Sequence, residues 1–163
     1  MLDLELDTET YDECLSALDR QFAELTKQAQ QLSAQFLEVA TEKKKLPILI
    51  TVSEDKRYRS TAIRWSKVIP TRKEGARRIM VKPIRKGRDT HKYPAIAFRF
   101  VDPTLRARVL HYEEMLSVLR YSLSRNCAAH SHLINTKKSL EKQVASIGGS
   151  VCLGSADDKA LLS

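Results

Sequence analysis

The segment around which this chain is organised is YRSTAIRWSKVI, residues 58–69. Cationic side chains alternate there with β-branched and aromatic ones, as in a strand that points successive side chains to opposite faces of a sheet. The two expected faces hold Ile63, Trp65 and Ile69 on one side, and Arg64, Ser66 and Val68 on the other. Residues 57–69 are therefore expected to form a strand with one apolar and one mainly polar face.

Neighbouring segments extend this strand into a sheet. Residues 46–52 (LPILITV) are short and β-branched, and the polar residues 53–56 that follow predict a turn. Residues 77–84 (RRIMVKPI) form a third expected strand, in which Pro83 favours an edge position or the strand's end because proline has no N–H to donate. With a turn or loop over residues 70–76, the prediction is a three-stranded antiparallel meander.

A heptad pattern precedes the sheet. Apolar side chains recur at steps of three and four from Leu15 to Val39, which predicts a helix over about residues 8–44. Thr8 or Thr10 is the expected N-cap, and Pro47 prevents the helix from continuing.

A second heptad pattern follows the sheet, from Leu105 to Ile147. It predicts a helix over residues 103–147 that begins at Asp102-Pro103 and stops at Gly148-Gly149. Before it lie a basic loop, residues 85–94, and the ambiguous residues 95–100, which fit a short helix or a strand that packs Phe98 and Phe100 inward.

These elements predict an α+β fold with two long antiparallel coiled-coil-like helices flanking a small three-stranded antiparallel β-sheet, and a basic loop at its tip. The expected organisation is an acidic N-terminal coiled-coil helix (residues 1–45), a basic β-meander and loop (46–102), a long C-terminal helix (103–147) and a disordered tail (148–163).

The two apolar seams differ in length, at roughly 36 Å and roughly 63 Å for a rise of 1.5 Å per residue. The first helix would therefore cover only part of the second. The uncovered remainder is either a homo-oligomer contact or a helix that frays into solvent. Polar seam residues such as Asn126, His130 and Lys137 fix register or oligomer state. The expected oligomer contacts are Leu116, Leu119, Leu123, Asn126, His130, Leu133 and Leu140.

Charge is strongly polarised along the chain. Residues 43–108 hold 20 Lys/Arg against five Asp/Glu, a net of +15, whereas residues 1–42 hold two against ten, a net of −8. A positive surface of this strength favours a polyanion as partner, and arginine suits bidentate contacts with phosphate and guanine. The expected nucleic-acid contacts are Arg57, Arg59, Arg64, Trp65, Lys67, Arg77, Arg78, Lys82, Arg85, Lys86, Arg88, His91, Lys92 and Tyr93.

Catalysis is not expected. The pair His130 and His132 would need to share one face of a strand to hold a metal, but two residues apart in a helix they point in different directions. No phosphate-cradling glycine loop is present, and the three cysteines lie far apart without C-x-x-C spacing, which indicates reduced thiols. We therefore expect a non-enzymatic protein with no metal and no cofactor.

Localisation is expected to be cytoplasmic. No apolar run reaches 18 residues, so no membrane span is expected, and the acidic N-terminus is unlike a signal peptide.

Three short motifs in order carry a family resemblance. The matching positions are Arg64, Trp65, Lys67, Lys86, Gly87, Arg88, Tyr93 and Pro94, followed by a long helix. Over about residues 57–120 this order resembles the MobI-type auxiliary conjugative-transfer proteins of plasmids and integrative conjugative elements. The resemblance implies a DNA-processing factor that acts at an origin of transfer and assists a relaxase.

The sequence thus predicts a DNA-binding accessory protein of conjugative DNA transfer, with duplex DNA favoured, a relaxase as a possible partner and homo-oligomers formed through the helices. Two alternatives remain open. One is a coiled-coil adaptor whose basic tip binds an acidic protein, and the other is an RNA-binding module.

Overall fold

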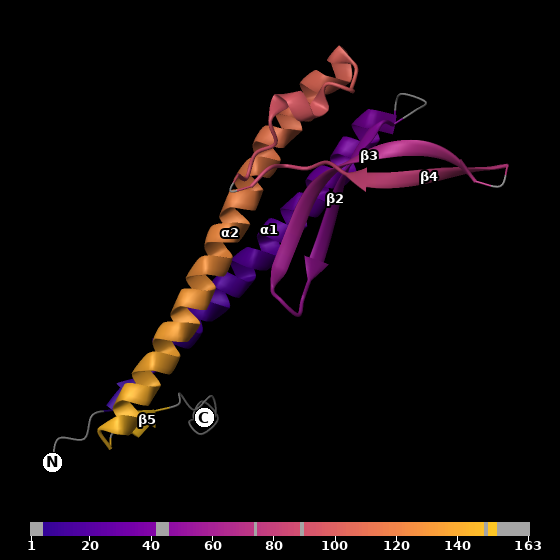
Figure 1. The fold of residues 1–163 in the computed structure, drawn as a ribbon. Helices are drawn as coiled ribbons and strands as arrows, with labels where there is room; N and C mark the ends of the chain where they lie inside the picture. The colour runs from indigo at the N-terminus through magenta and orange to yellow at the C-terminus, as the bar shows by residue number, and fades with distance from the viewer. Residues whose placement is uncertain (1–4, 42–45, 74, 89, 149, 153–163) are drawn as a thin grey trace, which may run out of the picture. The chain divides into compact units, whose positions relative to one another are not determined.

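A computed structural model describes residues 5–41, 46–73, 75–88, 90–148 and 150–152. The elements, in chain order, are β1 (Glu5–Asp7), α1 (Glu9–Thr41), β2 (Ile48–Asp55), β3 (Ser60–Lys73), β4 (Ala76–Pro83), the 3₁₀ helix η1 (Ala95–Phe98), α2 (Pro103–Ser146) and β5 (Ser150–Cys152) (Figure 1). The predicted α+β class, with two long helices and a three-stranded antiparallel sheet, is confirmed.

The chain divides into two compact units, and each long helix contributes to both. The larger unit comprises residues 23–125 and holds the three-stranded sheet. The smaller unit comprises residues 1–22 and 126–163.

The sheet of the larger unit has the strand order β2-β3-β4. β2 pairs with the first part of β3, from Asp55↔Ser60 to Ile48↔Lys67. β4 pairs with the remainder, from Ser66↔Pro83 to Lys73↔Ala76. The central strand β3 therefore changes partner almost completely at Lys67, and beyond that residue β3 and β4 form a two-stranded hairpin that extends past β2 (Figure 1).

The loop predicted over residues 70–76 is wrong, because β3 continues through Pro70 to Lys73 and β4 already begins at Ala76. Proline is tolerated there because the missing N–H faces a side without a strand. Ile84 N donates to Trp65 O at 2.8 Å, so odd-numbered residues of β3 bond to the β4 side. Val68 N donates to Pro47 O at 2.9 Å, so even-numbered residues face the β2 side, which is empty beyond Lys67.

Pro83 ends β4, which is an edge strand, so both parts of that expectation are confirmed. β2 runs three residues further than predicted, to Asp55, and the Asp55 carboxylate accepts hydrogen bonds from the backbone N–H groups of Arg57 and Tyr58 in the turn. The turn therefore lies over residues 56–59 rather than the predicted 53–56, and β3 begins at Ser60 rather than at residue 57.

The core of the larger unit is built around Trp65, which is fully buried. Its ring packs edge-on against Phe36 of α1 and Phe98 of η1, with ring centroids 5.0 and 5.5 Å apart. Such edge-to-face aromatic pairs stabilise the core beyond the contribution of apolar burial alone. The odd-numbered face of β3 is thus the core face, as the alternation of the sequence predicts, and α1, η1 and α2 supply the residues packed against it.

Helix α2 begins as predicted. Leu105 N donates to the Asp102 carboxylate at 3.1 Å, so Asp102 is the N-cap and Pro103 occupies the first turn. The ambiguous residues 95–100 form η1, which buries Phe98. Phe100 is exposed instead, with the Lys67 ammonium 4.2 Å from its ring centroid.

In the smaller unit the first part of α1 pairs with the last part of α2. Asn126 donates to Leu18 O at 3.0 Å and to Gln21 Oε1 at 2.7 Å, and His130 lies 3.4 Å from Asp19. Further along α2, Lys137 Nζ donates to Asp12 at 2.7 Å, so partners in α1 have lower numbers as those in α2 rise, and the two helices are antiparallel there.

These contacts correct the expectation that the second half of the helix is uncovered. Asn126 and His130 are used within the chain, and Leu116, Leu119 and Leu123 are buried in it, while Leu133 and Leu140 are half-buried. Oligomerisation through coiled-coil seams stays a prediction.

The smaller unit also holds a parallel pair of short strands, β1 and β5, from Glu5↔Ser150 to Asp7↔Cys152. The prediction of a disordered tail over residues 148–163 is therefore wrong for β5, and residues 149 and 153–163 lie outside the described residues. Asp7 accepts from Glu9 N at 2.8 Å. Thr8, one of the two expected N-caps, is the residue immediately before α1, and its backbone carbonyl accepts from Asp12 N at 3.2 Å.

Candidate nucleic-acid interface

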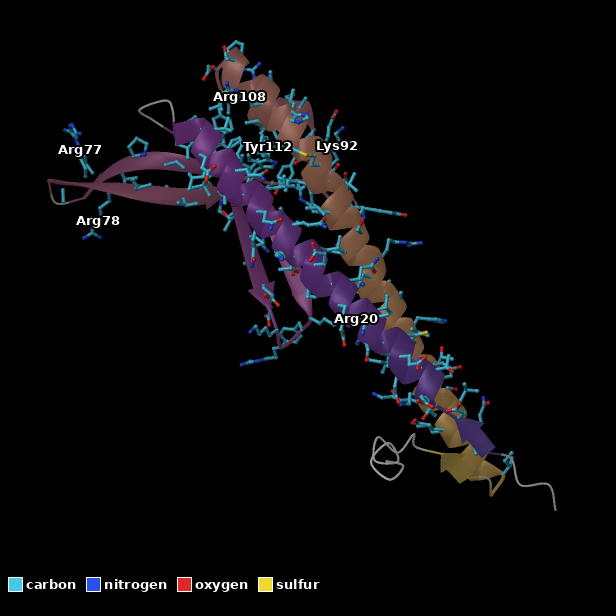
Figure 2. All side chains as sticks on the ribbon, turned by 180° about the vertical axis from the view of Figure 1, so that it is seen from behind. Arg20, Arg77, Arg78, Lys92, Arg108 and Tyr112 are labelled. Atoms are coloured by element: carbon cyan, nitrogen blue, oxygen red, sulfur yellow. The ribbon has the colours of Figure 1, made fainter. Side chains whose placement is uncertain are left out.

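The predicted cationic contacts occupy three different places in the larger unit. Lys67, Arg77, Arg78 and Lys82 lie on the β3–β4 hairpin beyond β2, which is called the ribbon below (residues 67–82). Arg57, Arg59 and Arg64 lie on the β2–β3 hairpin, and Arg85, Lys86, Arg88, His91 and Lys92 lie on the loop before η1. Figure 2 shows Lys92 beside α2, apart from Arg77 and Arg78 at the far end of the ribbon.

The ribbon is the most exposed of these places. Every residue of β4 is exposed, including Ile79 (73 %), Val81 (48 %) and Met80 (46 %). Among the described residues, no strand pairs with the outer side of β4 or with β3 beyond Lys67, so both edges of the ribbon present backbone groups that no described strand bonds. An open two-stranded element of this kind, with exposed cationic and apolar side chains, is available for contact with a ligand.

Charge on the ribbon is almost entirely of one sign. Residues 67–82 hold six Lys/Arg and one Asp/Glu. Two cross-strand pairs join like charges, Lys67↔Lys82 and Arg72↔Arg77. Like charges directly opposite one another destabilise a hairpin by a few tenths to about 1 kcal/mol. Among the described carboxylates, none pairs with Arg72, Arg77, Arg78 or Lys82.

The β2–β3 hairpin has a more balanced charge. An open hollow on it is lined by Arg57 and Arg64 but also by Glu54 and Asp55. Neighbouring carboxylates offset the positive field of the two arginines, so this hairpin is a weaker candidate than the ribbon for a polyanion.

The loop of residues 85–94 is packed against the protein rather than placed at the tip, which corrects that expectation. The Lys86 ammonium donates to Thr90 O, and Gly87 has a φ of +102°, a conformation that other residues adopt only with strain. Lys86 and Gly87 therefore shape the loop. Arg85, Arg88 and Lys92 remain exposed on it, and His91 is half-buried with its ring 5.4 Å from that of Tyr121.

Two of the predicted nucleic-acid contacts are wrong, because their side chains are buried. Trp65 is fully buried and Tyr93 is 3 % exposed, so neither ring can stack on a base. Burial raises the pKa of the Tyr93 hydroxyl above its ordinary value, against the opposite effect of a backbone hydrogen bond with Trp65.

Both aromatic residues are held by Glu113, a fully buried carboxylate of α2. Glu113 Oε2 accepts from Trp65 Nε1 at 2.6 Å, and Oε1 accepts from Tyr93 N at 2.7 Å. Arg120, one heptad further along α2, donates to both oxygens at 2.9 and 3.0 Å. This network fixes β3 and the end of the loop to α2.

The remaining donors of Arg120 extend the network into the backbone. Its Nε donates to Ile63 O at 2.9 Å and its Nη1 to His91 O at 2.8 Å, and its guanidinium lies 4.8 Å from the centre of the Tyr93 ring. A buried ion pair is tolerated when further hydrogen bonds satisfy its remaining atoms, as here.

Sequence reasoning missed Glu113 and Arg120. The available signal was two opposite charges seven residues apart at the border of the apolar seam, in step with Val109, Leu116 and Leu123. A helix face that repeats apolar and charged residues at steps of four and three can bury both charges if they pair.

The described residues offer neither a metal-binding cluster nor a membrane-spanning helix. In the described part of the chain, no group of three or more His, Cys, Asp or Glu side chains could hold a metal ion. His132 is exposed, as expected, and His130 is half-buried. No helix among the described residues has both the length and the apolar character needed to cross a membrane.

The residues that resemble a family motif thus have two roles in this structure. Trp65 and Tyr93 build the network around Glu113, while Arg64 and Arg88 are exposed. No curated protein and no solved structure matches the chain. Residues 18–134, which include the sheet, the loop and most of both helices, match the model of the family described as MobI protein. The chain therefore belongs to the MobI protein family.

Proposed function

We propose that this protein is a non-enzymatic accessory factor of conjugative DNA transfer that binds DNA at an origin of transfer and assists a relaxase. Membership of the MobI family supports a role in mobilisation. The observation that carries the DNA-binding part is the ribbon, an exposed two-stranded element with six Lys/Arg and no described carboxylate paired with its exposed cations.

Electrostatics favours a polyanion at this element over an isolated ligand. The like-charge pairs Lys67↔Lys82 and Arg72↔Arg77 destabilise the free ribbon, and a phosphate backbone would neutralise both. Binding by the ribbon therefore relieves a repulsion that is present in the free protein.

Anisotropy titrations with labelled duplex test this proposal. The probes are the origin-of-transfer fragment of the element that encodes the protein and a shuffled fragment of equal length, at several salt concentrations. If about six phosphates are contacted, log K should fall against log salt with a slope of about −5. Tighter binding to the origin fragment supports the proposal, whereas no binding at low salt contradicts it.

A matched pair of variants locates the contact. The triple substitution Arg72→Ala, Arg77→Ala and Arg78→Ala should make the salt slope shallower by about 1 for each lost phosphate contact. The control is Lys27→Ala, Lys138→Ala and Lys142→Ala, which removes the same charge from exposed helix positions. Equal effects of the two triples would show that only net charge matters.

Assistance to a relaxase needs a separate assay. The element's purified relaxase is incubated with supercoiled plasmid that carries the origin of transfer, with and without this protein. We expect more nicked plasmid when wild-type protein is present, and no increase with the ribbon triple variant. An increase that survives the triple variant would place the assistance elsewhere in the molecule.

A further inference from the structure

Along the ribbon, two cationic bands enclose an apolar band. The inner cationic pair is Lys67↔Lys82, and the outer band comprises Thr71↔Arg78 and Arg72↔Arg77. The three pairs between them are apolar throughout: Val68↔Val81, Ile69↔Met80 and Pro70↔Ile79. This order is cationic, apolar, cationic.

The dimensions of this pattern match one groove of duplex DNA. At about 3.3 Å per residue, Lys67 and Arg72 lie roughly 17 Å apart along the strand. The major groove is about 12 Å wide and admits a two-stranded β-ribbon, so part of the ribbon would lie inside the groove while its remaining cations reach the phosphates at the groove's rims. The minor groove is only about 6 Å wide, so a ribbon enters it only where the duplex is bent or the groove widened.

Single-stranded nucleic acid fits the ribbon less well. Proteins that bind single strands stack exposed aromatic side chains on the bases. Residues 67–82 include no aromatic residue, and the nearby Trp65 is buried. The exposed apolar side chains of the ribbon are aliphatic, which suits contact with the C5-methyl groups of thymine in the major groove.

The two faces of the ribbon differ in what surrounds them. The face that continues the core face of β3 carries Lys67, whose ammonium lies against Phe100, together with Arg78. The opposite face, called the Arg72 face, comprises Val68, Pro70, Arg72, Arg77, Ile79 and Val81. Figure 2 shows Arg77 and Arg78 leaving opposite sides of the ribbon. The Arg72 face points away from the core face and holds the most exposed aliphatic residue, Ile79.

We propose that the ribbon inserts into the major groove of duplex DNA with the Arg72 face against the base pairs. Arg72 and Arg77 lie where a guanidinium reaches O6 and N7 of guanine, and Ile79 and Val81 lie where they meet thymine methyl groups. On the back of the ribbon, Arg78 and Lys82 reach phosphates at the groove's rims. This inference rests on the proposed function and adds to it the groove and the protein face that reads it.

Two duplexes of one mixed sequence distinguish the grooves. In the first, every cytosine carries a glucosylated 5-hydroxymethyl group, which fills the major groove and leaves the phosphates and the minor groove unchanged. In the second, inosine replaces guanine, which removes only a minor-groove amino group. Against unmodified duplex, we expect wild-type protein to bind the glucosylated duplex roughly tenfold or more weakly, and the inosine duplex about equally.

Matched ribbon variants assign the face. Arg72→Ala with Arg77→Ala removes two charges from the Arg72 face, and Arg78→Ala with Lys82→Ala removes two from the other face. The first pair should lower the preference for unmodified over glucosylated duplex towards one. The second pair should weaken binding to both duplexes together and keep the preference. Far-UV circular dichroism and the melting temperature establish that both variants fold.

The outcomes of these titrations separate groove insertion, the face of the ribbon and the proposed function. Equal binding of wild-type protein to unmodified and glucosylated duplex overturns groove insertion while the proposed DNA binding stands. Loss of the preference in the Arg78, Lys82 variant alone overturns the assignment of the face. If no duplex binds at low salt, the proposed function fails, and this inference fails with it.

Discussion

At the residue scale, the two carboxylate oxygens of Glu113 hold several parts of the fold together. Its two oxygens accept four hydrogen bonds, from Trp65, Tyr93 and twice from Arg120, and the residue is fully buried. A buried carboxylate without partners would be strongly unfavourable, so its retention in the core depends on all four donors. One helix residue thereby holds the central strand and the loop that precedes η1.

We predict that Glu113→Gln lowers the free energy of unfolding by about 3–5 kcal/mol, because it leaves the Arg120 charge buried without a counter-charge. The amide also places an NH₂ group where the carboxylate accepted donors. Urea denaturation measures the change. The control is Glu114→Gln at the neighbouring exposed position, where we expect a change within about 0.5 kcal/mol. A similar small change for both variants would contradict a stabilising network.

Tyr93 gives stability a dependence on alkaline pH. Because burial raises the pKa of its hydroxyl in the folded protein, the unfolded chain releases the proton first as pH rises. The free energy of unfolding should therefore fall above about pH 10, by at most about 1.4 kcal/mol per pH unit, until pH passes the folded pKa. Tyr93→Phe should remove this contribution in urea titrations from neutral to alkaline pH. Tyr58→Phe, at a side chain that is 76 % exposed, should keep it.

At the element scale, the composition of the ribbon lowers its own stability, as the proposed binding role would require. Its cross-strand pair Arg72↔Arg77 repels, and none of the residues of β4 is buried. The hairpin is therefore held by backbone bonds and by its root in β3 rather than by packing. Stability and DNA binding are expected to respond in opposite directions to changes of charge there.

We predict that Arg77→Glu stabilises the ribbon and weakens DNA binding. Replacing a like-charge cross-strand pair by an opposite-charge pair should stabilise the hairpin by a few tenths to about 1 kcal/mol. The ribbon amides should then exchange with solvent roughly two- to fivefold more slowly, as amide hydrogen exchange measures. Arg88→Glu makes the same charge change on the loop, without a cross-strand partner, and should leave the exchange of the ribbon unchanged. Faster exchange in the Arg77 variant would show that the pair does not repel.

At the scale of the whole molecule, the packed core and the proposed DNA-binding element occupy different parts of the larger unit. The buried residues come from the helices, β2, the first part of β3 and the segment around η1, whereas the ribbon beyond Ile69 adds none. The larger unit thus has a packed body and an exposed ribbon, to which we assign the proposed DNA binding.

This separation predicts that the ribbon can be shortened without unfolding the protein. Replacing residues 70–79 by Asn-Gly joins Ile69 to Met80 through a two-residue turn of the type that hairpins favour. We expect the melting temperature to change by a few degrees at most, because little buried area is removed, and DNA affinity to fall at least tenfold. Calorimetry and anisotropy provide the two readouts. Unchanged affinity would place DNA binding on the other basic surfaces.

Much of the fold could be predicted because it depends on local pattern. Heptad steps located both long helices within a few residues of α1 and α2, and alternation located β3 and its core face. Asp102-Pro103 marked the start of α2 through cap chemistry that needs only neighbours in sequence. The acidic and basic composition likewise indicated the region of the candidate interface, although not which of its parts projects.

What only the tertiary structure decided depends on partners distant in sequence. From the sequence, Pro70 is expected in a loop, because the sequence does not show that β2 ends opposite Lys67. Asn126 is expected to be an oligomer contact, because the sequence does not show that Leu18 and Gln21 face it. The sequence places Trp65 both on the apolar face of its strand and among the expected nucleic-acid contacts, and the hydrogen bond of its indole to buried Glu113 decides for the core. The amino-acid sequence determined the elements and the charge of this protein, because short-range sterics and periodicity act within each segment. Burial and pairing followed only from packing, because they arise between segments that the chain brings together.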